Sequence, residues 1–287
     1  MNLPPTGSNG TKPTRAGPRI PNLALRALTA AIGLPVLALV TWTGGWPFAL
    51  VAAIVAFLAA TEFMHAWLMP TMPIPAILQH APTYAAASVV VAGAHVDPGF
   101  IYLGFLFAAL FAALGYTPTN AVGPRKPYRV LSWCLVYIGV LLATFVLVRD
   151  VPGGRDWVFL GLLSTFAVDT GAFATGKLIG RHKMAPGISP GKTWEGAVGG
   201  YVCGVAACFA LNRLLDTGVP VSTLVPLALA LPVIAQAGDL FESWMKRRMG
   251  VKDASGLLPG HGGFLDRLDS LLFVMPLVYA FLRLRVL

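Results

Sequence analysis

The stretch from Trp157 to Gly176 reads WVFLGLLSTFAVDTGAFATG, and Asp169 is its only charged residue. A helix rises about 1.5 Å per residue, so a run of about 20 residues matches the roughly 30 Å of hydrocarbon in a bilayer. Similar apolar stretches recur along the chain, of whose 287 residues 56% are hydrophobic and 11% charged. The core of a single soluble domain cannot bury so many hydrophobic residues. The sequence therefore predicts an all-α, polytopic integral membrane protein.

Apolar stretches of this kind predict about nine transmembrane helices. The third stretch is interrupted by Gln79 and His80, so a re-entrant or interfacial segment is the alternative there. The predicted spans are Ala27–Thr43, Trp46–Ala60, Ile74–Ala94, Gly99–Tyr116, Val130–Val148, Trp157–Gly176, Ala197–Leu215, Val221–Leu240 and Leu265–Leu282.

The chain divides into three parts by composition. Residues 1–22 are rich in Pro and Gly and predict a disordered cytosolic tail, residues 23–156 a transmembrane scaffold, and residues 157–287 a catalytic region. The net charge of +9 comes from basic residues that lie mostly in alternate loops. This pattern follows the positive-inside rule and argues against a nucleic-acid partner. Within the scaffold, Glu62 and His65 are one helical turn apart and are either site residues or interfacial residues.

Four carboxylates lie where a bilayer disfavours charge. An Asp at the centre of a span costs roughly 2.5–3.5 kcal/mol, and such residues usually face a polar cavity or a partner, as we expect for Asp169. Span eight must continue past Gly238 to cross the bilayer, which puts Asp239 at its inner end, with Glu242, Ser243 and Lys246 following at helical spacing. We therefore expect one polar face on this helix.

The last span extends the same argument. Its uninterrupted apolar run, 271–282, would reach only about 18 Å, so the helix must begin near Leu265. That start puts Asp266 and Asp269 in the first turn, at the membrane level of Asp239 and within reach of Asp169. Clustered acids repel one another, and Mg²⁺ favours carboxylate oxygens while leaving positions for substrate phosphates. We predict all four acids as metal ligands; the alternative is structural ion pairing with Lys246, Arg247 and Arg267.

Two glycine-rich basic loops connect the spans that carry these acids. The first, residues 176–196, contains Lys-Thr after a glycine but lacks the first glycine of a Walker motif. It leads into a helix whose N–H groups suit an anion. The second, residues 252–264, runs directly into the last span. The candidate phosphate-binding residues of the two loops and of span eight are Ser189, Gly191, Lys192, Thr193, Ser243, Gly262 and Gly263.

The continuous stretch from Ser243 to Asp269, SWMKRRMGVKDASGLLPGHGGFLDRLD, resembles the signature of CDP-diacylglycerol synthases (phosphatidate cytidylyltransferases). Asp169-Thr-Gly-Ala and the segment from Ser189 to Gly196 are also similar to that family, which commonly has serine in place of Thr170. The resemblance covers about 157–282, whereas the first five spans agree mainly in being apolar. Thr170 keeps the hydroxyl group of the serine that the family commonly has there, so this difference leaves the expected function unchanged.

The resemblance implies that CTP and phosphatidic acid react to give CDP-diacylglycerol and pyrophosphate. It implies Mg²⁺, as two ions, with Mn²⁺ as a substitute, a homodimer, and a bacterial inner (plasma) membrane with the active site on the cytosolic face. Asp239, Asp266 and Asp269 match the expected metal positions, and Asp169 supports them. The other catalytic candidates are Lys192, Lys246, Arg247, Lys252, Asp253, His261 and Arg267.

Two other functions fit parts of the pattern. A CTP-dependent lipid kinase of the polyprenol type would transfer a γ-phosphate to an alcohol, but the continuous signature from His261 to Asp269 argues against it. A cation-coupled transporter would also place acids inside spans. A CDP-alcohol phosphotransferase is excluded because its spaced acidic pattern is absent.

Overall fold

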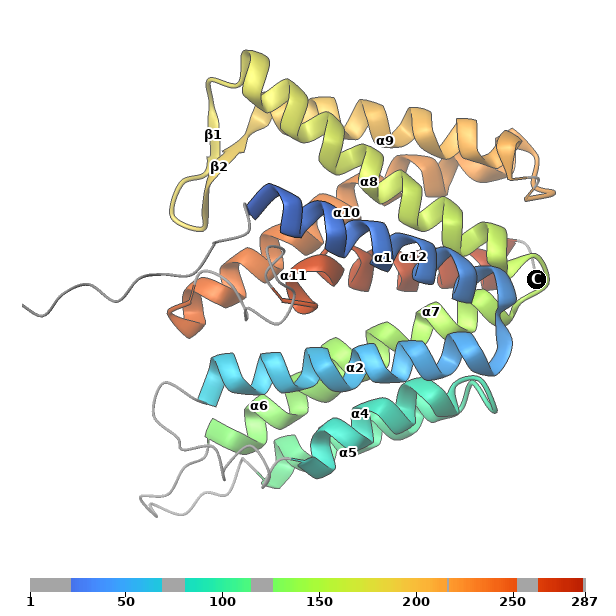
Figure 1. Cartoon of the computed structure of the whole chain (residues 1–287), viewed down its shortest axis with the longest axis vertical. Helices are drawn as coiled ribbons and strands as arrows, with labels where there is room; N and C mark the ends of the chain where they lie inside the picture. Colours follow the sequence, from blue (N-terminus) through green and yellow to red (C-terminus); the bar gives the residue numbers. More distant parts are fainter. Residues whose placement is uncertain (1–21, 69–80, 115–125, 216, 252–262, 286–287) are drawn as a thin grey trace, which may run out of the picture.

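The computed structural model describes residues 22–68, 81–114, 126–215, 217–251 and 263–285. Figure 1 shows long helices that run side by side, with a small β-hairpin at one end of the bundle. The helices are α1 (Asn22–Thr43), α2 (Gly45–Leu68), α4 (Ala81–Gly93), α5 (Phe100–Leu114), α6 (Lys126–Cys134), η1 (Leu135–Val140), α7 (Leu141–Asp150), α8 (Gly154–Ile179), α9 (Trp194–Leu214), α10 (Val221–Met249), α11 (Leu265–Leu268) and α12 (Leu271–Arg285).

The helices confirm an all-α membrane protein. Within the described ranges, five helical segments are long and apolar enough to cross a bilayer: Gly45–Trp67, Arg129–Asp150, Gly154–Ile179, Trp194–Leu214 and Val221–Met249. The apolar segments Ala31–Thr43, Ala81–Gly93 and Phe100–Ala113 are shorter. The total of nine crossings stays a prediction, since residues 69–80, with Gln79 and His80, lie outside the described part, as does the tail before Asn22.

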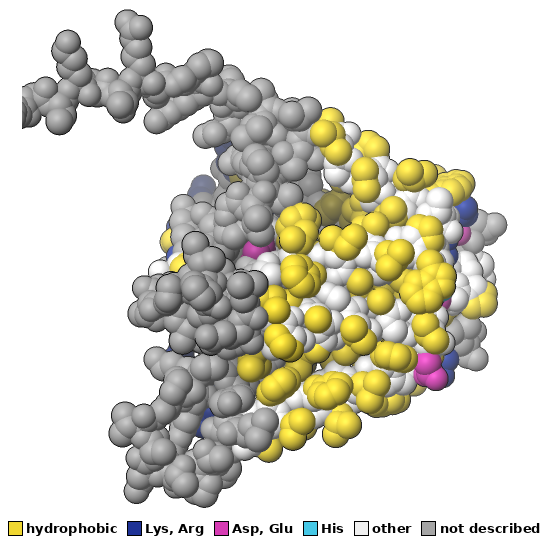
Figure 2. All heavy atoms as spheres, turned by 60° about the horizontal axis from the view of Figure 1, so that its bottom comes forward, with side chains coloured by type: hydrophobic (Ala, Val, Ile, Leu, Met, Phe, Trp, Pro, Cys, Tyr) yellow, Lys and Arg dark blue, Asp and Glu magenta, His cyan; other side chains and the backbone are white. Residues whose placement is uncertain are grey.

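Apolar side chains cover much of the outer surface. Figure 2 shows one face of the bundle on which hydrophobic side chains form a broad continuous area, with charged side chains only near its two ends. Of the described apolar residues, Leu39, Trp42, Ile54 and Tyr102 are all more than half exposed. A patch of this size would aggregate in water but is the expected surface toward lipid.

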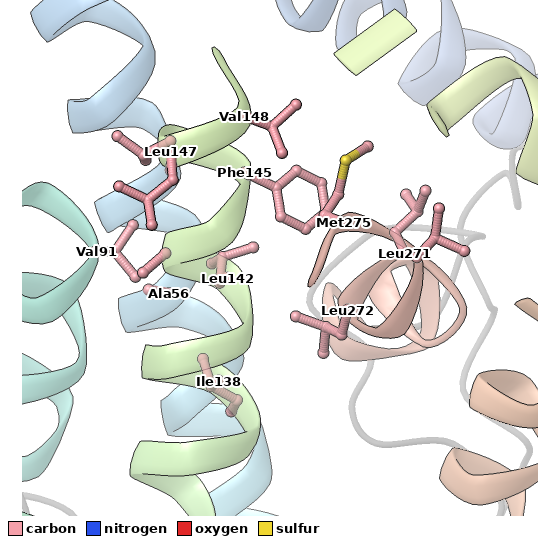
Figure 3. Close-up of a cluster of buried hydrophobic side chains, with 14 of the residues drawn as sticks. Ala56, Val91, Ile138, Leu142, Phe145, Leu147, Val148, Leu271, Leu272 and Met275 are labelled. Carbon is pink, nitrogen blue, oxygen red and sulfur yellow. The ribbon is translucent and has the colours of Figure 1, made fainter. Parts of the chain in front are cut away.

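The interior of the N-terminal part is filled around α7. In Figure 3, Leu142 and Phe145 of α7 lie between Val91 of α4 on one side and Leu272 and Met275 of α12 on the other, and all five are buried. Such packing excludes water and leaves no polar path through the middle of these helices. This region therefore serves as the wall against which the last helices pack.

A π-helical turn, η1, joins α6 to α7. Its Tyr137 lies among aromatic rings from three other helices, with ring centroids 6.1 Å from Phe63, 5.6 Å from Phe241 and 6.1 Å from Phe273. One-turn π segments of this kind often occur beside functional sites. The aromatic cluster connects α2, α10 and α12 just inside one end of the bundle.

Small residues let α8 and α9 approach closely. A Cβ atom added to Gly196 would lie 2.8 Å from the carbonyl oxygen of Ala172, and one added to Gly200 would lie 2.8 Å from that of Val168. Gly204, one further turn along α9, faces the side chain of Val168. Glycines at every fourth position are a common interface between transmembrane helices. This interface fixes the position of the residues that begin α9.

The glycine-rich segment after α8 is a β-hairpin, which corrects its prediction as a simple loop. Strands β1 (Lys183–Ala185) and β2 (Ser189–Thr193) pair antiparallel, with Lys183 opposite Thr193. The prediction missed it because short strands rich in Pro and Gly carry no alternating apolar pattern. Helix α9 starts directly after β2, where the Thr193 hydroxyl caps it by accepting a hydrogen bond from the Gly196 N–H at 3.1 Å.

The last predicted span is divided into α11 and α12, which corrects the single helix expected from Leu265. The helix starts at Leu265 as expected, but it is interrupted at Asp269 and Ser270. The Asp269 carboxylate accepts a hydrogen bond from the Ser270 N–H at 2.6 Å. Such local side-chain bonds compete with the helical pattern. Asp266 therefore lies in α11 and Asp269 at the junction, rather than in one regular first turn.

Candidate active site

A cavity of about 480 Å³ opens at the hairpin end of the bundle, between α8, the hairpin, α9 and α10. Helix α8 ends there, α9 begins there, and the second half of α10 passes beside it. The lining therefore combines a carboxylate from the middle of a span with the backbone of a hairpin. The sequence-predicted residues that line it are Asp169, Ser189, Gly191, Lys192, Thr193 and Asp239.

Lys192 and Asp239 form an ion pair across this cavity. The Lys192 ammonium nitrogen lies 2.7 Å from Asp239 Oδ2, so strand β2 is held against α10. Ser243, one turn further along α10, has its hydroxyl 3.5 Å from Asp239 Oδ1. The ion pair holds the Lys192 ammonium group beside the carboxylate, where it can also bind a substrate phosphate.

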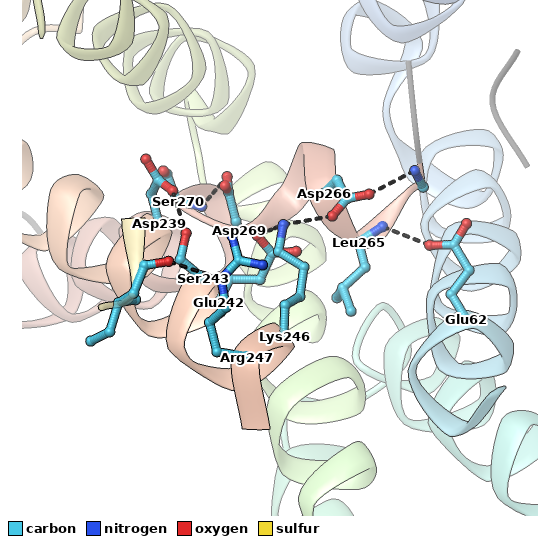
Figure 4. A network of polar contacts seen from close by, with 12 residues as sticks. Glu62, Asp239, Glu242, Ser243, Lys246, Arg247, Leu265, Asp266, Asp269 and Ser270 are labelled. Carbon is cyan, nitrogen blue, oxygen red and sulfur yellow. Dashed lines mark hydrogen bonds and ion pairs between the residues drawn. The ribbon is translucent and has the colours of Figure 1, made fainter. Parts of the chain in front are cut away.

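Lys246 forms a second polar centre on the next turns of α10. Its ammonium nitrogen lies 2.8 Å from Asp266 Oδ1 and 3.0 Å from Glu242 Oε2 (Figure 4). The other oxygen of Asp266, Oδ2, accepts a hydrogen bond from the Gly263 N–H at 2.9 Å. Lys246, which belongs to α10, therefore connects Glu242 of the same helix to Asp266 of α11. Ion pairing with Lys246, the alternative to metal binding raised from the sequence, is thus observed for Asp266.

The remaining carboxylates are close enough for their charges to interact. Asp169 experiences the charges of Asp239 and Asp269, and Asp269 that of Asp239. Figure 4 shows Asp269 between Asp239 and Asp266, at the break before α12. Three helical regions thus bring acids from positions 100 residues apart to one level of the bundle.

Glu62 links this centre to the N-terminal helices. This carboxylate of α2 is 2% exposed and accepts hydrogen bonds from the N–H groups of Phe264 (3.0 Å) and Leu265 (2.9 Å), where α11 begins. Glu62 therefore binds backbone N–H groups that have no hydrogen-bond partner within the helix at its first turn. Gly263 lies directly against it, since an added Cβ would be 2.6 Å from a Glu62 oxygen. The sequence had placed Glu62 only among possible site residues, and His65, its predicted companion, is exposed.

The hairpin is fixed at both of its ends. Glu195 accepts hydrogen bonds from the backbone N–H groups of Arg181 and His182, and its Oε1 lies 2.6 Å from His182 Nδ1. Near the turn, the guanidinium Nε of Arg247 donates to the carbonyl oxygen of Ile188 at 3.1 Å. Arg247 thus positions the hairpin against α10, and nothing lies within 4 Å of a Cβ added at Gly191. The open space at Gly191 leaves room for a ligand beside the strand.

Several predicted residues cannot be placed in the site. Lys252, Asp253, His261 and Gly262 lie outside the described residues. Arg267, on α11, is exposed, but its charge acts on Asp169. Sequence reasoning omitted Glu242 and Gln236 from its site residues, although Glu242 is 1% exposed beside Lys246 and Gln236 lines the cavity. Glu242 could have been identified from the sequence, because it lies one helical turn before Lys246.

The donor chemistry of the cavity suits a hard divalent cation. Among the described residues, no three His, Cys, Asp or Glu side chains are gathered closely enough to form a metal site by themselves. Mg²⁺, however, is often held by one or two carboxylates and completed by water and substrate phosphates. The interacting carboxylates Asp169, Asp239 and Asp269 provide such oxygens. Both oxygens of Asp239 contact donors from Lys192 and Ser243, just as both oxygens of Asp266 contact donors from Lys246 and Gly263. A metal-ligand role for each of the four stays a prediction.

Fold and site together define an integral membrane protein with carboxylates and lysines gathered at one end of its helices. The sequence pattern of the cytidylyltransferase family matches residues 24–285, and the chain belongs to this family. It is 34% identical over 257 residues to the phosphatidate cytidylyltransferase of Staphylococcus saprophyticus, and this match covers 89% of this chain and 97% of the relative. The enzymes of the same name from Staphylococcus aureus and Staphylococcus haemolyticus are each 33% identical, with the same coverage.

Proposed function

We propose that this protein transfers the cytidylyl group of CTP to phosphatidic acid, giving CDP-diacylglycerol and pyrophosphate for phospholipid synthesis. A phosphate oxygen of phosphatidic acid attacks the α-phosphorus of CTP, and the bond from that phosphorus to the oxygen bridging the β-phosphate breaks. The nucleophile is a phosphate monoester that is already largely ionised at neutral pH, so little general-base help is needed. The main requirement is to bring two anions together.

The observation that carries this proposal is the cavity in which Lys192 and Asp239 meet. Lys192 and the N–H groups at the start of α9 provide positive potential for a phosphate on one wall. Lys246, held between Glu242 and Asp266, provides a second cation on the neighbouring turns of α10. These residues would bind and orient the two phosphate groups, and Asp169 would face them from α8.

A divalent cation belongs to the same proposal. Asp239, Asp266 and Asp269, supported by Asp169, would hold Mg²⁺, as two ions, with Mn²⁺ as a possible replacement. Such ions screen charge repulsion and stabilise a leaving pyrophosphate. Lys252, Asp253, His261 and Arg267 are proposed to lie around the phosphates on the strength of the sequence signature alone.

The setting is proposed as a bacterial plasma membrane with the active site on the cytosolic side, where CTP is available. The bacterial relatives and the concentration of basic residues in the predicted inner loops support this orientation. A homodimer also remains a proposal.

Two positions of the radioactive label distinguish this reaction from its alternative. With purified full-length protein, phosphatidic acid and Mg²⁺, CTP labelled at the α-phosphate should give labelled lipid, and CTP labelled at the γ-phosphate should give labelled pyrophosphate. A polyprenol-type lipid kinase would instead move the γ-label to a lipid alcohol, and a transporter would release neither product. Asp150→Asn, at the opposite end of the bundle, is the control, and failure to form α-labelled lipid would refute the proposal.

A further inference from the structure

A second cavity, also of about 480 Å³, lies at the same end of the bundle between α2, α6 and α10. It shares no residue with the cavity that contains Lys192 and Asp239. Rings of Tyr137, Phe241 and Phe273 pack together, with the Phe241 and Phe273 centroids 5.3 Å apart, and Phe241 also lines the second cavity. The second cavity is therefore a separate space on the other side of α10.

The lining of this second cavity changes from charged to apolar along the helices. Arg129 and Trp133 are one turn apart on α6, Trp244 and Arg248 one turn apart on α10, and Phe63 and Trp67 one turn apart on α2. Arg129, Arg248 and Trp67 each lie within one turn of a helix end, and Trp133, Trp244 and Phe63 lie one turn further in. Membrane proteins place cations and indole rings in this order at the level of lipid headgroups.

The polar groups of the second cavity are donors and cations. The indole Nε1 of Trp67 is buried and has no hydrogen-bond partner within the described part of the chain. Across the same ranges, neither Arg129 nor Arg248 forms an ion pair with a carboxylate, although the Arg248 guanidinium lies 5.3 Å from the centroid of the Trp244 ring. No Asp or Glu is among the described lining residues. A buried indole N–H normally has an acceptor, and the two arginines beside it favour an acceptor that carries negative charge.

We infer that this cavity binds one anionic phospholipid from the leaflet on the active-site side. The lipid phosphate would meet Arg129, Arg248 and the Trp67 N–H, and an acyl chain would follow Trp133 and Phe241 toward the bundle centre. Charge complementarity selects a negative headgroup, and the apolar inner part selects a lipid over a soluble phosphate. Because α2 and α6 belong to the N-terminal helices and α10 carries Asp239, the bound lipid joins the scaffold to the catalytic helix.

Native mass spectrometry of the full-length protein tests this inference. The protein is purified from nanodiscs that contain equal amounts of phosphatidylglycerol and phosphatidylcholine, and the retained lipids are counted. Phosphatidylglycerol has no phosphate monoester and cannot be the nucleophile of the proposed reaction, so this test is independent of the proposed function. We expect one phosphatidylglycerol to be retained in preference to phosphatidylcholine. Equal retention of the two lipids would overturn the inference.

Three variants locate the binding. The double variant Arg129→Gln and Arg248→Gln should lower the preference for phosphatidylglycerol about thirtyfold, since each arginine contributes on the order of 1 kcal/mol to an anionic lipid contact. Trp67→Phe keeps the ring and removes only the donor to the lipid phosphate, so it should lower the amount of retained phosphatidylglycerol by about threefold. Arg213→Gln alters a cavity at the opposite end of the bundle and should change nothing.

Each outcome of the variant series decides the inference. An unchanged preference in the double variant would overturn it, and so would an equal loss in Arg213→Gln, because that result would indicate general surface charge. Circular dichroism and the gel-filtration profile of each variant show whether the fold is retained. If the double variant does not fold, Trp67→Phe alone decides the matter, and retention of as much phosphatidylglycerol as in the unaltered protein would then overturn the site.

Discussion

The helices before and after residue 150 use their apolar side chains differently. In the segment Arg129–Asp150, 78% of the most apolar window is buried inside the protein, whereas in Trp194–Leu214 only 22% is buried. The first segment forms a filled centre, and the second presents most of its surface outward while its glycines contact α8. The difference shows that α7 forms part of a filled interior, whereas α9 borders the open, charged cavity.

The two parts depend on each other at Glu62. This carboxylate belongs to α2 by sequence but binds the backbone at the start of α11. The N-terminal helices therefore do more than fill space, because they help to set the position of Asp266. The predictions below examine this division, from the largest expected effect to the smallest.

The largest effect is expected from Asp269→Asn in the C-terminal part. The variant loses a charge beside Asp239 and Asp169 but keeps a similar shape, so the protein should still fold in the membrane. We expect the formation of CDP-diacylglycerol to fall by about a thousandfold, the upper range for loss of one electrostatic group in an active site. Turnover is measured at saturating Mg²⁺, and a rate near that of the unaltered protein would remove Asp269 from the proposed metal site.

Glu62→Ala tests the connection between the two parts. The substitution leaves two N–H groups at the start of α11 without their acceptor, so Asp266 should lose its fixed position. We expect kcat to fall by about tenfold to a hundredfold and the stability to fall by about 1–2 kcal/mol. Glu62→Gln keeps an oxygen acceptor and should recover part of kcat.

His65→Ala is the matched control for Glu62, because it lies one turn away on α2 and is exposed. It should leave kcat unchanged. If Glu62→Ala lowers stability but not kcat, Glu62 is only structural, and the proposed coupling between the scaffold and Asp266 is wrong.

Gly200→Ala tests the close approach of α8 and α9. Its new Cβ would lie 2.8 Å from the backbone oxygen of Val168, so the helices must separate. We expect a loss of about 1–3 kcal/mol, as for other overpacked contacts, measured by thermal unfolding in detergent. Gly33→Ala on α1 is the control, since nothing lies within 4 Å of its added Cβ, and an equal loss there would contradict the packing argument.

The smallest effect is expected from His95→Gln at the end of the bundle opposite the active site. The His95 ring nitrogen lies 2.7 Å from Asp150, and both side chains are partly exposed. Ion pairs of this kind contribute at most about 1 kcal/mol. Activity should therefore remain unchanged and the unfolding temperature should shift only slightly. A large loss of activity would show that the two ends of the bundle are coupled.

The sequence alone predicted the membrane class, the approximate positions of α2, α8, α9 and α10, and the acids that face the site. These features follow from local composition, because apolar length determines what can cross a bilayer and a charge inside such a run is costly. Helix α10 was predicted to continue past Gly238 for this reason, and it continues to Met249. The glycine repeat of α9 was also present in the sequence but was not interpreted.

Only the tertiary structure decided which charged groups meet. The ion pairs of Lys192 with Asp239 and of Lys246 with Asp266, the β-hairpin, and the break at Asp269 depend on how separate segments pack. The contact of Glu62 with Leu265 joins residues 203 positions apart. A local pattern gives the cost of burying a charge, but the partner that compensates this cost is chosen by the packing of the whole chain.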